Sequence, residues 1–459
     1  MSTTSQPTTL NGPAGWLPTP ASEPLLHALN EDYALVMAQG QVHVISRTRH
    51  GFQYMKPSDF ELFHATTLIW ITDGAQVKQR PLGAYWLREW PKRRTHPDVD
   101  FLPEPAGTHP TPPKNGSPFN LWSAWGVVPT PGDTAIFHSH LLDHICVGNR
   151  EHYHYVLDWL ADLVQHPADI PGVSIVLRGE PGTGKGRFAR VITDLVGSAH
   201  SQHITDTRML TSRFQASMAT SLFVFADESV WGGDKSAEQV LKGIITEDDT
   251  QVEDKYVRSF KVRNCRRFLF ASNMDWAVPV ANNDRRYFVL DVAMPLDREA
   301  KAKFFGDYET WRKAGGPGHL LHELMQRPIG PRLPPMPYSV ATASIKREAM
   351  PPQDEFVLSL LAGDIYVEPA NIPLEGGGWS GDVTRHTLYK AYADWCKLTS
   401  KQHYGGEQRF FGALHKIFPP KDGVRWKGNQ RLFVFGPLDE ARAQFAHYYK
   451  VISFADLFA

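Results

Sequence analysis

Cysteine, long apolar runs and an excess of either charge are all scarce in this sequence of 459 residues. Its three cysteines form no CxxC pair, which argues against a zinc ribbon or a disulfide framework and fits a reducing cytosol. No apolar run approaches the roughly 18 residues of a membrane span, so we expect no membrane segment. Because the formal net charge is only -1, any affinity for nucleic acid must come from local patches.

We expect the first residues of the sequence to form a flexible tail and not a signal peptide. Residues 1–23 are rich in Ser, Thr and Pro, with neither a basic start nor an apolar block, and predict a flexible tail. The whole length is too great for one compact domain. Shifts in composition predict four further segments: an α+β module at 24–135, a core with a helical prelude at 136–327, a proline-rich linker at 328–354 and a last domain at 355–459.

The stretch 172–197 has the pattern of a strand, a glycine loop and a helix. Its apolar run at 173–177 suits a strand buried on both faces, and apolar residues then recur at helical spacing. Between them, GEPGTGK is a GxxxxGK phosphate loop, whose backbone N–H groups and lysine bind nucleotide phosphates. The usual Ser or Thr that would bind Mg²⁺ is replaced by glycine, so the metal must depend on other groups or on water. The expected nucleotide-binding residues are Gly179, Glu180, Pro181, Gly182, Thr183, Gly184, Lys185 and Gly186.

Two later apolar runs also end in polar residues. The run 221–226 is followed by Asp227 and Glu228, and the run 267–272 by Asn273. Because ligands of an α/β sheet bind at the carboxyl ends of its strands, we expect all three side chains beside the phosphate loop. Asp227 would hold Mg²⁺, Glu228 would deprotonate the attacking water, and Asn273 would reach the γ-phosphate or the water. ATP and Mg²⁺ are the expected cofactors, with Lys185 as a catalytic residue.

Two adjacent arginines follow in the sequence NNDRRYF. We expect one of Arg285 and Arg286 to stabilise charge on a γ-phosphate, that of a neighbouring subunit, while the other pairs with a carboxylate such as Asp284. Two purely structural ion pairs are the alternative.

Two basic segments are candidates for contact with DNA. An acidic run at 247–254 precedes a basic run at 255–267, and a hairpin tipped by Lys255 would suit the pore of a ring, although a solvated strand edge is possible. Near the end, two helical stripes precede two strands around a Gly428-Asn429 turn, which suggests a winged helix or simply a solvated basic hairpin. The candidate residues are Lys255, Arg258, Lys261, Arg425, Lys427 and Arg431.

In this order, GEPGTGKG, FVFADESVWGGDK, LKGIITEDDTQVEDK, FLFASN and NNDRRYFVLDV resemble the helicase domain of phage and plasmid primase-helicases, a superfamily three branch of the AAA+ ATPases. The resemblance covers roughly residues 30–292. It implies an α/β fold with a P-loop AAA+ core, in which glycine after the loop lysine is tolerated. It also implies a homo-hexameric helicase that moves 3′ to 5′ on single-stranded DNA, in the cytoplasm of a bacterial host, beside a primase or polymerase.

Two other functions stay open. GEPGTGKGRF also resembles the phosphate loop of nucleoside-monophosphate kinases, although a water-activating Glu228 would have no use there. An ATP-gated factor that loads on DNA without unwinding it would share every motif. A primase within this chain is not expected, because the carboxylate pattern around 98–109 is too closely spaced, and no metal beyond Mg²⁺ is expected.

Overall fold

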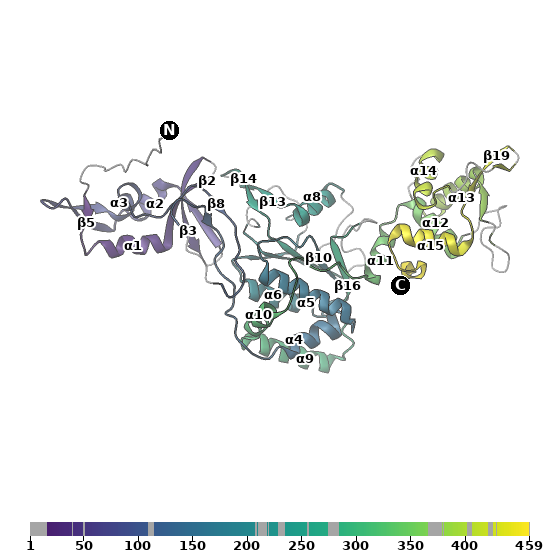
Figure 1. Cartoon of the computed structure of the whole chain (residues 1–459), viewed down its shortest axis with the longest axis horizontal. Helices are drawn as coiled ribbons and strands as arrows, with labels where there is room; N and C mark the ends of the chain where they lie inside the picture. Colours follow the sequence, from purple (N-terminus) through teal and green to yellow (C-terminus); the bar gives the residue numbers. More distant parts are fainter. Residues whose placement is uncertain are drawn as a thin grey trace, which may run out of the picture.

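The computed structural model describes residues 16–38, 40–48, 51–108, 114–206, 209, 218, 220–227, 235–254, 257–273, 284–365, 379, 381–401, 406–420, 426–427 and 429–458. An N-terminal unit, a central sheet with its helices and a C-terminal unit follow one another along the long axis of the molecule (Figure 1). None of the described helices has both the length and the apolarity needed to cross a membrane. A mixed α/β class is confirmed, whereas the domain boundaries taken from composition stay predictions.

The N-terminal unit combines short helices with small sheets of orders β1-β5-β6, β4-β3-β2-β7 and β8-β9. Proline near the first position starts two of its helices, where its fixed φ suits a helix and its missing N–H costs nothing. The elements are α1 (Glu23–Asp32), α2 (Pro57–Phe63), α3 (Leu82–Arg88), β1 (Leu17–Pro18), β2 (Tyr33–Ala38), β3 (Gln41–Thr48), β4 (Gly51–Met55), β5 (Leu68–Thr72), β6 (Val77–Pro81), β7 (Thr95–His96), β8 (Val99–Asp100) and β9 (Phe119–Asn120).

The central sheet is parallel and has the strand order β11-β12-β15-β10-β16. Its strands are β10 (Ser174–Arg178), β11 (Ser201–Ile204), β12 (Phe223–Ala226), β15 (Arg267–Ser272) and β16 (Tyr287–Asp291). Successive side chains enter different cores: Ile175 and Leu177 pack on one side of the sheet, and Val176 packs on the other. The apolar runs are continuous because both faces of the sheet are covered.

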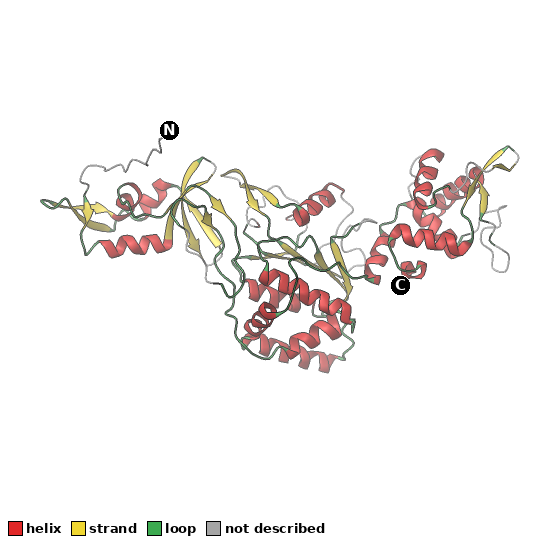
Figure 2. Cartoon of the chain, in the orientation of Figure 1, coloured by secondary structure: helices red, strands yellow, loops and turns green. Residues whose placement is uncertain are grey.

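Helices cover the two faces of this sheet unequally (Figure 2). One face packs against the core that contains α5 (Arg150–Gln165), α6 (Lys185–Val196) and α10 (Gly316–Gln326), with α4 (Ala135–Ser139), the π-helix η1 (His140–Ile145) and α9 (Arg298–Lys313) beyond them. The other face packs against α8 (Lys235–Thr246) and α11 (Val340–Glu348). Strands β13 (Asp249–Asp254) and β14 (Val257–Arg263) form the expected hairpin, and its expected tip, Lys255, lies outside the described residues.

The C-terminal unit has a hydrophobic core of its own around α12 (Pro352–Ala362), α13 (Arg385–Leu398), α14 (Glu407–Ile417) and α15 (Leu438–Tyr449). A small sheet of order β17-β19-β18 and a 3-10 helix, η3 (Phe454–Phe458), complete it. Its strands are β17 (Asp382–Thr384), β18 (Trp426–Lys427) and β19 (Gln430–Val434). Because Trp426 pairs with Arg431 and Lys427 with Gln430, the hairpin expected around Gly428-Asn429 is confirmed.

The segment 328–354, expected as a linker, contains the ordered helix α11. Ala341 and Ile345 on this helix are buried against the central sheet. Lys346 Nζ donates a hydrogen bond of 2.9 Å to the carbonyl oxygen of Tyr449 in the C-terminal unit, and burial lowers the pKa of this amine to about 8. The proline-rich segment therefore contains a short helix that packs against the central sheet and is hydrogen-bonded to the C-terminal unit. This part of the segment is not a flexible linker.

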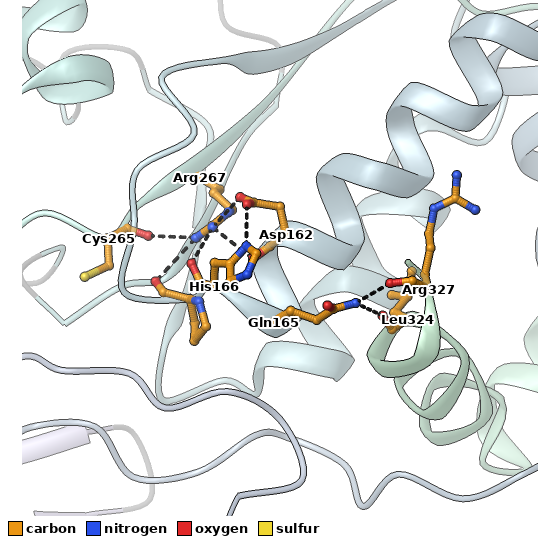
Figure 3. Close-up of polar contacts among 8 residues, drawn as sticks. Asp162, Gln165, His166, Cys265, Arg267, Leu324 and Arg327 are labelled. Carbon is orange, nitrogen blue, oxygen red and sulfur yellow. Dashed lines mark hydrogen bonds and ion pairs between the residues drawn. The ribbon is translucent and has the colours of Figure 1, made fainter. Parts of the chain in front are cut away.

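The end of the basic run at 255–267 is buried, which corrects the expectation of a solvated or DNA-facing segment. Arg266 is buried, and burial lowers its pKa to about 10. The Arg267 side chain is fully buried at the start of β15, where Nη2 donates to Asp162 Oδ2 at 2.7 Å and to the His166 carbonyl at 2.9 Å (Figure 3). Nη1 lies 3.4 Å from the Pro167 and Cys265 carbonyls. Arg267 therefore joins the sheet to the end of α5.

Candidate functional site

The predicted phosphate loop lies between β10 and α6, at the carboxyl edge of the central sheet. Gly184 has φ of 101°, in the left-handed region that favours glycine, and is the N-cap residue of α6. A Cβ added there would lie 2.5 Å from His140 Nε2 and 2.9 Å from the Phe305 ring. Glycine is therefore required at this position by backbone conformation and by close packing from α9 and η1.

Lys185 brings the loop and the end of β15 together. Its side chain is buried, and Nζ donates to Asn273 Oδ1 at 2.9 Å and to the carbonyls of Gly179 and Glu180 at 2.5 and 3.0 Å. The ammonium group thus sits over the loop at the edge where the strands end. Gly179 and Glu180 contribute carbonyl oxygens to the lysine, and they do not line the adjoining cavity.

An open cavity of about 1090 Å³ adjoins the loop. It combines the loop with residues that follow β12 and β15 and with one side of α9. The lining residues are Pro181, Gly182, Thr183, Gly184, Lys185, Gly186, Arg187, Arg190, Thr193, His203, Phe225, Asp227, Asn273, Arg298, Lys301, Ala302, Phe305, Gly306 and Glu309. The structure therefore collects the expected loop, Asp227 and Asn273 around one space.

Four cationic side chains of this cavity were missed by the sequence analysis: Arg187, Arg190, Arg298 and Lys301. Among the described residues, these cations and Lys185 share the cavity with only two carboxylates, and one of these, Glu309, is paired with Arg312 Nη2 at 2.8 Å. Such an excess of positive charge beside a glycine loop suits a ligand with several negative charges, such as a polyphosphate.

Asp227 is the other carboxylate among the described residues of the cavity, and its Oδ2 lies 3.7 Å from His203 Nε2. Within the described residues no group of three or more His, Cys, Asp or Glu side chains is arranged to hold a metal. One carboxylate with phosphate oxygens and water is a donor set that fits Mg²⁺, which binds proteins through few carboxylates. Gly186 leaves open space where a hydroxyl could stand.

The side chains of several other candidate residues fall outside the described part of the structure. Glu228, Lys255 and Arg425 lie outside the described residues. Arg258 and Lys261 belong to β14, and Lys427 belongs to β18, but their side chains are not described. Their catalytic and DNA-binding roles stay predictions.

The two adjacent arginines lie away from the cavity, at the amino end of β16. Arg286 donates from N and Nη1 to Asp284 Oδ1 at 3.0 and 3.3 Å, and Arg285 is exposed. Because β16 runs parallel to β10, with Tyr287 beside Ser174 and Asp291 beside Arg178, four residue steps of about 3.3 Å separate this edge from the loop edge. Neither arginine is therefore placed to reach the cavity of its own chain.

The comparisons with known proteins point to phage replication proteins. Residues 177–286 match a sequence family described as "Family of unknown function (DUF5906)". The chain is 28% identical over 138 residues to the "DNA Primase-polymerase" of Nitratiruptor phage NrS-1, a match that spans 29% of this chain and 19% of that protein. The aligned part is thus less than a fifth of the relative.

Solved structures extend the likeness to nearly the whole chain at the level of fold. One apo structure of the NrS-1 C-terminal region has a TM-score of 0.62 and 15% identity, covering 90% of this chain and 99% of that one. A second has a TM-score of 0.58, also at 15% identity, with 90% and 98% covered. The expected likeness to phage replication proteins is confirmed at this coarse level, whereas the superfamily three helicase assignment stays a prediction.

Proposed function

We propose that this chain is an ATP-driven motor of phage DNA replication, with a P-loop AAA+ core of the superfamily three helicase type. It binds ATP with Mg²⁺, assembles as a homo-hexamer and moves 3′ to 5′ along single-stranded DNA, beside a primase or polymerase. Lys185 and the cations of the cavity hold the phosphates, Asp227 holds Mg²⁺, Glu228 activates water and Asn273 positions it.

The observation that carries this proposal is the convergence of Lys185, Asp227 and Asn273 at one cationic cavity. These residues follow three different strands, and α9 adds Arg298 and Lys301 from the far side. The loop also lies where the direction of the strand connections reverses. After β10 the chain crosses to β11 at one edge of the sheet, whereas after β15 it crosses to β16 on the other side of β10. Ligands of open α/β sheets bind at such switch points.

DNA contact is proposed for two hairpins. Arg258 and Lys261 belong to the second strand of the β13–β14 hairpin, and Lys255 falls between its two strands in the sequence. The β18–β19 hairpin belongs to a unit whose helices and β17-β19-β18 sheet suit a winged helix. The similarity to a phage protein named DNA Primase-polymerase supports a nucleic-acid substrate.

The proposed function is tested with the purified full chain, ATP, Mg²⁺ and forked DNA. We expect ATP hydrolysis that single-stranded DNA stimulates, and ATP-dependent strand displacement. Hydrolysis without displacement would favour the loading factor. Phosphoryl transfer to a nucleoside monophosphate in the absence of DNA would favour a kinase and refute the motor.

A shared active site predicts rescue between subunits. Since Arg285 is exposed at the sheet edge away from its own cavity, an Arg285→Ala subunit mixed with a Lys185→Ala subunit should recover part of the hydrolysis that each lacks alone. The readout is the ATPase rate over a series of mixing ratios, with mixed assemblies verified by differential tags. Mixed assemblies that stay inactive at every ratio would show that Arg285 does not act across the interface.

A further inference from the structure

A second polar cavity, of about 510 Å³, lies in the C-terminal unit and is called here the C-terminal cavity. It forms where β17 leads into α13, where α14 begins and where the β18–β19 hairpin turns. All of its described lining residues are polar or charged: Thr384, Arg385, His386, Glu407, Gln408, Asn429 and Arg431. Segments almost fifty residues apart in sequence thus present hydrogen-bonding groups to one space.

Arg385 is held in place from one side by an aromatic ring. Its guanidinium carbon lies 3.9 Å from the centroid of the Phe411 ring, and its side chain is only 15% exposed. The ring supplies packing and a cation–π contact but no hydrogen-bond acceptor. In the described part of the chain, the buried Arg385 Nε has no hydrogen-bond partner, since Glu407 Oε1 is 3.8 Å away. Burying a guanidinium N–H that has no acceptor costs free energy, and a ligand that accepts a hydrogen bond from it removes this cost.

Arg431 brings a second positive charge toward the same cavity from β19. It is exposed, and no ion pair to it is found among the described residues. Burial, and then the like charge of Arg431, lower the pKa of the Arg385 guanidinium, and Glu407 only partly opposes this. Two arginines therefore face one distant carboxylate that is itself 47% exposed, which leaves the cavity with a net positive charge.

We propose that the C-terminal cavity binds a backbone phosphate of DNA, with Arg385 and Arg431 as its charged donors. Paired guanidinium groups match the oxygens of a phosphate diester, and the amides of Gln408 and Asn429 add neutral donors. The first helical hydrogen bonds of α14 start at the N–H groups of Arg409 and Phe410, so the N–H groups of Glu407 and Gln408 precede them. The inference rests on the proposed function, to which it adds Arg385 and Gln408 as DNA contacts that the hairpin alone does not provide.

A substitution of Glu407 tests the proposal in the opposite direction, because it should raise the affinity for DNA. Its carboxylate lies beside Arg385 and competes with a phosphate for the same guanidinium. Removing its charge should therefore strengthen binding of an anion, whereas a purely structural ion pair would show no such gain.

The experiment measures the anisotropy of a labelled forked DNA with the full chain, without nucleotide, over a series of salt concentrations. Arg431→Gln should weaken binding roughly tenfold, as expected for a lost charge-assisted hydrogen bond. It should also lower the slope of log affinity against log salt by about 0.7 to 0.9, the value for one phosphate. Glu407→Gln should tighten binding by about threefold, in the range of an exposed ion pair.

The matched control is Lys397→Gln at the other end of α13, about 18 Å along the helix from Arg385. Its side chain is 78% exposed, and its loss should leave both affinity and slope unchanged. Unchanged binding in either Arg431→Gln or Glu407→Gln would overturn the proposal. Inorganic phosphate that binds the wild type, but not Arg431→Gln, and displaces no DNA at constant ionic strength would assign the cavity to a free anion and also overturn the proposal.

The result is separable from the test of the motor. The anisotropy measurement uses no nucleotide, and the described lining residues of the C-terminal cavity and of the phosphate-loop cavity do not overlap. Loss of DNA affinity in Arg431→Gln would support the C-terminal cavity even if the wild type hydrolysed no ATP.

Discussion

Replacing Lys185 with alanine should abolish ATP hydrolysis and weaken nucleotide binding. Its ammonium group lies over the loop, hydrogen-bonded to Asn273 and to two loop carbonyls, and the residue lines the cationic cavity. A bound phosphate would take over these contacts, and the positive charge would stabilise the transferring oxygens. The measurements are nucleotide affinity by titration calorimetry and hydrolysis by phosphate release.

A companion substitution separates binding from chemistry. Glu228→Gln should leave ATP binding intact while turnover falls by roughly the 10²–10⁴-fold typical of a lost general base. Lys303→Ala is the matched control, because this exposed lysine of α9 pairs with Asp307 and does not line the cavity. Lys185→Met, which keeps most of the buried aliphatic stem, guards against a folding defect. Equal loss of binding in the Lys185 and Glu228 variants would refute the assigned roles.

The loop and the strand ends could be predicted because each depends on a few neighbouring residues. An apolar run, a glycine loop and a lysine specify strand, turn and helix locally. The parallel sheet then brings the ends of β12 and β15 to the loop, which is why Asp227 and Asn273 line the same cavity. The β18–β19 hairpin was found for the same reason, since turn residues between alternating strands are a local signal, whereas the β13–β14 hairpin was expected from the change from acidic to basic residues.

Contacts made by distant elements could not be predicted in this way. Arg298 and Lys301 belong to a helix more than a hundred residues after the loop, and only the packing of α9 directs them at it. Arg385 was not predicted as a site residue, because its role depends on Phe411 and Arg431 from two other elements. The stretch DREAK at 297–301, in which an aspartate suited to a helix N-cap precedes Arg298 and Lys301, was an available signal for the start of α9.

Arg267 shows why a run of basic residues is a poor guide to exposure. Arg263 is exposed, yet the next two arginines turn inward, because β15 begins there and the strand enters the core. The apolar run that follows Arg267 was visible, but the acceptors that make burial of a guanidinium tolerable come from α5 and its C-terminal end. The partner, Asp162, lies more than a hundred residues earlier.

Replacing Arg267 with alanine should therefore destabilise the central unit by about 3–5 kcal/mol, the usual effect of breaking a buried ion pair. The variant would leave the Asp162 carboxylate buried and remove donors from the carbonyls of His166 and Pro167 (Figure 3). We expect a marked fall in the urea midpoint of unfolding. Lys303→Ala, which breaks an exposed pair, should cost at most about 1 kcal/mol.

A double variant distinguishes an uncompensated charge from lost packing. The loss of stability in Arg267→Ala could come mainly from the Asp162 carboxylate, which stays buried without its partner. In that case Arg267→Met combined with Asp162→Leu should recover most of the stability. Apolar residues of similar volume often replace a buried ion pair at little cost in free energy. Recovery would identify the pair as dispensable for stability once both charges are removed. If the double variant is as unstable as Arg267→Ala, the carbonyl contacts at the end of α5 carry the stabilisation, because these are the acceptors that the double variant still leaves without a donor.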